Sequence, residues 1–126
     1  MFRYDISAHD GYLRAELLDR ETAEQTSEFL RAAGSAARAH RSTRVLICVH
    51  SSRPIFKIEQ YNASAYLKEI AARPWLRVAL VSSRHDLRSA HEYVEVLARQ
   101  QGAALRSFAD DASAIAWLRE EKKVTA

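Results

Sequence analysis

One short segment, Arg44-Val-Leu-Ile-Cys-Val-His50, is almost wholly apolar and rich in β-branched residues. Such a run is typical of an inner strand, because successive side chains point to opposite faces of a sheet and here both faces need cover. Two further apolar runs, over residues 76–81 and 103–108, predict strands of the same sheet. We therefore expect an α/β fold built around a largely parallel sheet.

The N-terminal residues predict an antiparallel hairpin. Residues 2–7 and 12–18 favour strands, and the Asp10-Gly11 pair between them is a strong turn signal. Single predicted helices separate the later strands, which requires right-handed crossovers between parallel strands. The expected order is β-β-α-β-α-β-α-β-α in one domain over residues 1–126.

The helix boundaries follow from capping residues and from helical spacing. The first helix is expected to reach about residue 39, the second to begin between residues 55 and 63, and the third to stop at Gly102. The expected N-terminal caps are Asp19 for the first helix, Ser83 or Asp86 for the third, and Asp110 or Asp111 for the fourth.

The composition is that of a folded globular protein, with 48% hydrophobic and 28% charged residues. The net charge is only +3 and the arginines are scattered along the chain, which argues against nucleic acid as a partner. No apolar run is long enough for a membrane span, and the first residues do not have the pattern of a signal peptide. These features predict a cytoplasmic protein.

The residues that commonly bind metals and cofactors are sparse or poorly spaced. Cys48 lies within the predicted central strand, where a thiol is expected to behave as a small buried hydrophobic group. The five histidines lack the spacing of a metal site, and three isolated glycines cannot form a glycine-rich phosphate loop. We therefore expect no metal and no cofactor.

Four segments of the C-terminal half occur in a familiar order: Arg77-Val-Ala-Leu-Val81, Ala90-His-Glu-Tyr-Val94, Arg99-Gln-Gln-Gly102, and the stretch from Leu105 to Leu118 that ends in Ala-Trp-Leu. This series resembles the SpoIIAA-like, STAS/SEC14-type proteins of bacteria, most closely over residues 76–119. The resemblance implies a STAS-like (SpoIIAA-like) βα superhelix and a regulatory module. The phosphorylated serine motif of the anti-sigma-factor antagonists is missing at residues 54–59, so that switch is not expected here.

Polar residues follow two of the predicted parallel strands. Open α/β sheets commonly bind ligands at the carboxyl ends of their strands, so both loops are candidates for one anion-binding pocket. The candidate ligand-binding residues are His50, Ser51, Ser52 and Arg53 after the central strand, and Ser83, Arg84 and His85 after the next one. The alternative is that they form polar turns and helix caps. No catalytic residue is predicted, because the serines lack the turn that presents a hydrolase nucleophile.

An aromatic and aliphatic cluster stands on or before the second helix. It comprises Phe56, Ile58, Tyr61 and Tyr66. These side chains could line an apolar cavity for a lipid-like ligand, or they could pack against the sheet or form a homodimer interface.

These observations lead to three hypotheses about function. The first is a non-enzymatic binding or regulatory module that acts through a protein partner or a small ligand. The second is a carrier or sensor of a small lipid-like or anionic ligand. The third is an enzyme whose chemistry the sequence does not reveal.

Overall fold

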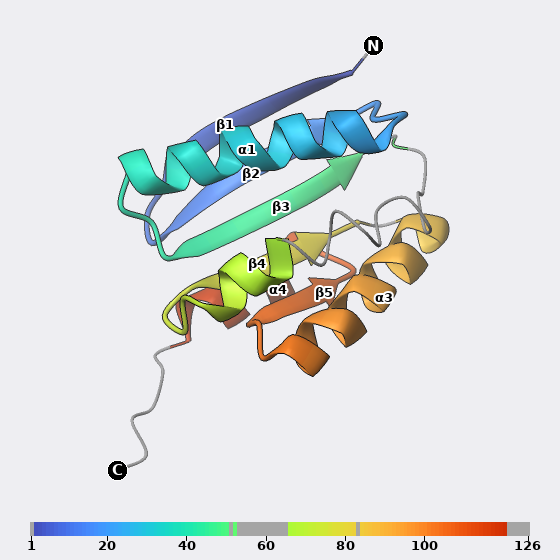
Figure 1. The fold of residues 1–126 in the computed structure, drawn as a ribbon. Helices are drawn as coiled ribbons and strands as arrows, with labels where there is room; N and C mark the ends of the chain where they lie inside the picture. Colours follow the sequence, from blue (N-terminus) through green and yellow to red (C-terminus); the bar gives the residue numbers. More distant parts are fainter. Residues whose placement is uncertain (1, 51, 53–65, 83, 121–126) are drawn as a thin grey trace.

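The computed structural model of the protein describes residues 2–50, 52, 66–82 and 84–120 (Figure 1). Its elements, in chain order, are β1 (Arg3–His9), β2 (Tyr12–Leu18), α1 (Ala23–Ala39), β3 (Arg44–His50), β4 (Arg77–Val81), α3 (His85–Gln101), β5 (Leu105–Phe108) and α4 (Asp111–Arg119). Residues 66–71 are also helical. The predicted start of this helix, between residues 55 and 63, lies outside the described residues.

The strands form one five-stranded sheet in the order β1-β2-β3-β4-β5. β1 and β2 are antiparallel, whereas β2, β3, β4 and β5 pair in parallel. The predicted α/β class, N-terminal hairpin and largely parallel sheet are therefore confirmed. Gly11 closes the hairpin with a φ of 86°, a left-handed conformation that a residue without a Cβ adopts at little cost.

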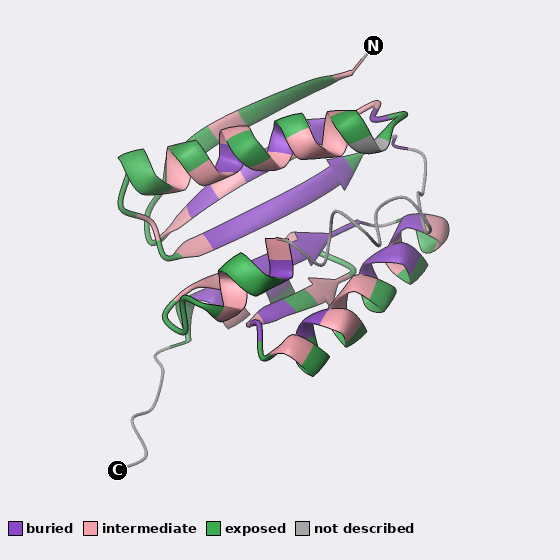
Figure 2. Ribbon diagram, viewed as in Figure 1, coloured by how far each residue is buried: buried purple, intermediate pink, exposed green. Residues whose placement is uncertain are grey.

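The central strand β3 contributes side chains to two separate cores, as its sequence predicts. Val45, Ile47 and Val49 face the side covered by α1, residues 66–71 and α3, whereas Leu46 and Cys48 face α4 (Figure 1). Figure 2 shows the middle of the strand buried; Arg44 at its start is half-buried and His50 at its end is exposed. The sheet therefore separates a three-helix layer from a layer that contains α4.

The first helix begins with a cap that differs from the predicted one. Thr22 caps α1, and its side chain accepts a hydrogen bond from the Gln25 backbone N–H while the Gln25 side chain accepts one from the Thr22 backbone N–H. Asp19 instead lies in the preceding turn with a φ of 56°. The reciprocal pair satisfies two N–H groups at once, which explains why the helix begins after Thr22 rather than after Asp19.

The caps of the two later helices are partly as predicted. Asp110 caps α4, and the hydrogen bond that it accepts from the Ser113 backbone lowers the pKa of its carboxyl group. Gly102 ends α3 in the left-handed conformation that the sequence predicts. The cap position of α3 is Arg84, which makes no side-chain capping bond, and Asp86 lies inside the helix. Asp86 was therefore wrong as a cap, and Ser83 lies outside the described residues.

Among the described residues, no helix combines the length and the hydropathy needed to cross a membrane.

Candidate functional site

A cavity of about 490 Å³ lies between the sheet and the three-helix layer. Its walls are mostly aliphatic and include Ile47 and Val49 of β3, Leu30 and Ala33 of α1, and Leu67 and Ile70 of the helical residues 66–71. A volume of this size is within the range of roughly 300 to 1,000 Å³ that small-molecule sites occupy. The cavity is therefore large enough for a ligand and is lined for an apolar one.

His91 of α3 brings a polar side chain into this apolar lining. It is 7% exposed, and within the described part of the chain its Nδ1 has no hydrogen-bond partner. Burial, reinforced by the positive charge of Arg20, lowers the pKa of His91 from 6.5 to about 4. The imidazole is therefore neutral at pH 7, with a buried nitrogen that is free to bond to a ligand.

Arg20 lines the same cavity and is 5% exposed. Its Nη1 donates to Thr26 Oγ1 at 3.3 Å, and its backbone N–H donates to Ser52 Oγ at 3.2 Å. Arg20 follows β2 and Ser52 follows β3, so these contacts lie at the carboxyl end of the parallel strands. The turn after β2 thus places a positive charge at this end of the cavity.

The structure brings together two of the residues predicted at the strand ends. Arg84 Nη1 donates to the Ser52 carbonyl at 3.2 Å, so the segments that follow β3 and β4 meet. Ser52 is almost fully buried and also donates to the His50 carbonyl at 2.9 Å, while Arg84 pairs with Asp86 at 2.6 Å. These bonds hold the turns in place. Ser51, Arg53 and Ser83 lie outside the described residues.

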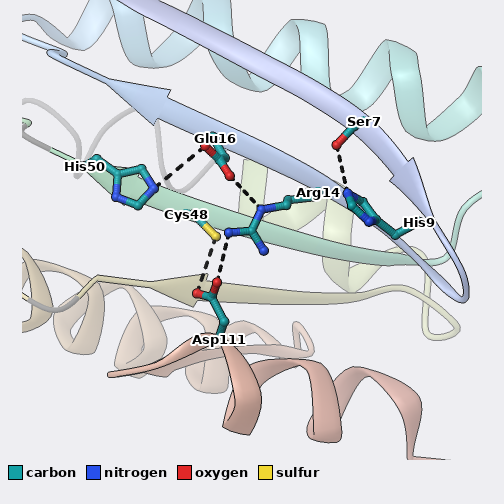
Figure 3. A network of polar contacts seen from close by, with 7 residues as sticks. All are labelled: Ser7, His9, Arg14, Glu16, Cys48, His50 and Asp111. Carbon is teal, nitrogen blue, oxygen red and sulfur yellow. Dashed lines mark hydrogen bonds and ion pairs between the residues drawn. The ribbon is translucent and has the colours of Figure 1, made fainter.

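His50 and His85 do not join this contact. His85 is exposed at the start of α3. His50 belongs to the set of β3 side chains that face away from the cavity, and its Nε2 lies 4.0 Å from Glu16 Oε2 (Figure 3). The predicted grouping of His50 with Ser52 and Arg84 in one pocket is therefore wrong for the His50 side chain.

A polar network connects β2 to α4 on that opposite face (Figure 3). Arg14 donates to Glu16 Oε1 at 2.6 Å and to Asp111 Oδ2 at 2.9 Å, and both bonds raise its pKa further. The Cys48 Sγ lies 3.9 Å from Asp111 Oδ1 and is fully buried, which raises the pKa of the thiol to about 12. Cys48 is therefore a protonated core residue, as predicted, and the network fastens α4 to the sheet.

Of the predicted apolar cluster, the structure describes one residue, Tyr66. Tyr66 lines the cavity, and its hydroxyl donates to the Ser27 carbonyl at 3.5 Å. Phe56, Ile58 and Tyr61 lie outside the described residues. The structure therefore places one of the four predicted side chains in the cavity wall.

The sequence interpretation missed His91 and Arg20. His91 lies four residues after Leu87 and three before Val94, so helical spacing places it on the same face as two apolar side chains, and that spacing carried a signal. Arg20 carried none, because its position depends on how the turn after β2 folds back on β3.

Fold and cavity together define an α/β protein with a ligand-sized apolar site between its sheet and its helices. Comparison of the sequence with protein-family models and with curated protein sequences finds no match.

Proposed function

We propose that this protein is a binding module for a small, mostly apolar ligand, which it holds in the cavity without transforming it. The observation that carries the proposal is the cavity of about 490 Å³, whose wall includes the buried His91 Nδ1, a nitrogen without a hydrogen-bond partner among the described residues. It corresponds to the second of the three sequence hypotheses. The STAS-like form of the fold and a regulatory role through a protein partner remain proposals that rest on the sequence resemblance.

Affinity and orientation would come from different parts of the cavity. Burial of an apolar ligand contributes roughly 25 cal/mol for each Å² removed from water, so the aliphatic walls supply most of the binding free energy. A buried nitrogen without a partner costs about 1 to 3 kcal/mol of desolvation, and a polar atom of the ligand at His91 Nδ1 would recover it. The imidazole would therefore fix the orientation of the ligand.

Gly34 gives a direct test, because it lines the cavity from the middle of α1. A Cβ at this position meets only the Arg38 side chain, at 3.8 Å, so a larger residue fits on the helix. Gly34→Leu places an aliphatic side chain at the cavity wall, whereas the control Gly34→Ala adds one methyl group. Both changes should stabilise α1 by about 1 kcal/mol, since Gly is a poor helix former.

Binding is measured with N-phenyl-1-naphthylamine, a neutral apolar dye whose fluorescence rises when it leaves water. We expect the wild type and Gly34→Ala to bind the dye and Gly34→Leu to bind it about tenfold more weakly, because the added side chain occupies space in the cavity and a misfit of about one methylene group costs roughly that factor. A dye that does not bind the wild type, or that binds Gly34→Leu equally well, would overturn the proposal.

A further inference from the structure

Three arginines line the cavity at the end opposite to His91 and Arg20. Arg38 is in the last turn of α1, Arg41 follows that helix, and Arg73 follows the helical residues 66–71. We call them the arginine cluster. Because the helices that connect parallel strands run back along them, these C-terminal ends lie near the amino ends of β3 and β4 (Figure 1). Trp75, which is 56% exposed, lines the same part of the cavity.

The charged side chains of the cavity are strongly unbalanced. Among the described residues, the arginine cluster and Arg20 line it together with one acidic residue, Glu69. The whole chain has 19 basic and 16 acidic residues, so basic residues are enriched among the described residues that line this cavity. Such a lining attracts an anion and repels a cation.

The arginine cluster has no carboxylate within ion-pair distance in the part of the chain that the structure describes. Arg73 donates to the Glu69 carbonyl at 2.8 Å, and Arg38 makes one long bond of 3.5 Å to Ser35 Oγ. Arg14, in contrast, binds two carboxylates through the same kind of fork. The guanidinium groups of the cluster therefore retain donors for another anion.

Arg41 has a backbone conformation that favours glycine. Its φ is 53°, and it occupies the left-handed position of a Schellman motif, in which Ser42 N donates to Ala37 O at 2.8 Å and Arg41 N to Arg38 O at 3.2 Å. Glycine is usual there, and a side chain in this conformation costs roughly 1 to 2 kcal/mol. Backbone strain of this kind concentrates at ligand sites, and Arg41 also lines the cavity.

We propose that the ligand is an amphiphile whose apolar chain fills the cavity and whose terminal oxyanion, a carboxylate or a phosphate, binds to the arginine cluster. This inference rests on the proposed function and adds the chemistry and position of the head group. The planar fork of an arginine matches the oxygens of either anion. The anion therefore binds near the amino ends of the strands, rather than in the carboxyl-end loops that the sequence favours.

Displacement of bound N-phenyl-1-naphthylamine from the full chain tests the head group. Decanoate, decyl phosphate and decanol have the same apolar chain and differ in the head. We expect each anion to displace the dye at about one tenth of the decanol concentration, and added salt to weaken the anions but not decanol, because exposed charges are screened. The two anions distinguish a carboxylate site from a phosphate site.

Arg41→Gly separates binding from stability. We expect it to weaken decanoate about fivefold to tenfold, the loss of one charge-assisted hydrogen bond, and to leave dye binding unchanged while raising the melting temperature. Arg41→Lys should keep part of the preference for decanoate over decanol. Arg31→Ala changes an exposed arginine of α1 outside the cavity lining and should keep all of this preference.

The two proposals fail in different ways. If the dye binds but decanol displaces it as well as decanoate does, or if Arg41→Gly keeps the preference, the head-group inference is wrong and the apolar site stands. If the dye does not bind at all, the proposed function is wrong.

Discussion

His91 is the one histidine of the five that the fold buries; His9, His40, His50 and His85 are exposed. Burial disfavours the charged imidazolium, and the nearby Arg20 adds a like charge, so the ring stays neutral far below pH 6.5. A neutral imidazole has one donor and one acceptor nitrogen. His91 therefore offers hydrogen bonding inside an apolar cavity without bringing a charge into it.

The first prediction concerns the stability of the protein in acid. An unfolded chain takes up a proton at His91 near pH 6.5, whereas the folded chain does so only near pH 4. Since the unfolded state binds more protons between these values, His91 makes folding less stable as the pH falls, by up to about 3 kcal/mol. His91→Phe removes this contribution. Urea unfolding at neutral pH and close to pH 4 should therefore show that the free energy of unfolding of the variant rises relative to that of the wild type as the pH falls.

The exposed His85 provides a matched control, because His85→Phe makes the same substitution outside the core. If the difference in the free energy of unfolding between His91→Phe and the wild type is the same at both pH values, the imidazole of His91 is not neutral and buried in the folded protein.

At the scale of elements, α4 is held by its two ends as well as by its apolar face. Asp111 at its start binds Arg14 of β2. At its end, Arg77 Nη1 donates to the Trp117 carbonyl and Arg44 Nε to the Leu118 carbonyl, both at 2.8 Å. These pairs place negative charge at the helix N-terminus and positive charge at its C-terminus, which suits the helix dipole. The helix is therefore fixed in register on the sheet.

The second prediction concerns the aromatic contact of α4. The centres of the Trp117 and Phe108 rings are 5.8 Å apart, and the Arg77 guanidinium lies 5.4 Å from the centre of the Trp117 ring. Trp117 is half-buried, so Trp117→Ala should lower the free energy of unfolding by about 2 kcal/mol, less than the 3 to 5 kcal/mol of a fully buried tryptophan. Urea unfolding followed by circular dichroism measures the change.

Trp75→Ala is the matched control, since the Trp75 side chain is 56% exposed and should contribute less than about 0.5 kcal/mol. Equal effects of the two substitutions would mean that Trp117 does not pack on the sheet.

The sequence predicts the strands and the hairpin well because their signals are local. The apolar run of β3, the Asp10-Gly11 turn and the stop at Gly102 depend on neighbouring residues alone. The cap at Thr22 could also have been predicted from the sequence, since Gln25 follows three residues later, as a capping box requires.

The candidate site could be predicted only in part, because its residues meet through packing. Alternation along β3 places His50 on the face of Cys48, away from Val49 and the cavity, and this much could have been derived from the sequence. The arginine cluster could not, since Arg41 and Arg73 are far apart in the chain and line one cavity only because two helices end near the amino ends of the strands.

At the scale of the whole molecule, the two faces of the sheet have different packing. The face toward α4 carries a small core of Leu46, Cys48, Ala79, Val81, Ala114 and Leu118, bounded by the Arg14 network. The other face carries the larger core together with the cavity. Alternate residues of β3 belong to the two cores, so the sheet is part of both. Its backbone lies between them and keeps their side chains apart.

The third prediction follows from this separation. A ligand that binds only the folded protein stabilises it by about 2.7 kcal/mol when its concentration is roughly 100 times its Kd. N-phenyl-1-naphthylamine should therefore raise the melting temperature of the wild type. Gly34→Leu should raise the melting temperature without dye and lose about half of the shift with dye, because tenfold weaker binding lowers the stabilisation to roughly 1.4 kcal/mol. Trp117→Ala should lower the melting temperature without dye and keep the whole shift that the dye causes, because Trp117 lies on the opposite face of the sheet.

The double variant decides whether the two layers act independently. Substitutions without shared neighbours usually change stability additively to within about 0.5 kcal/mol. The effects of Gly34→Leu and Trp117→Ala on the free energy of unfolding should therefore sum in the combined protein. A clear departure from the sum, or a dye shift that Trp117→Ala abolishes, would mean that packing against α4 controls the shape of the cavity through β3. In that case the face of α4 would regulate binding, and the two faces of the sheet would form one cooperative unit.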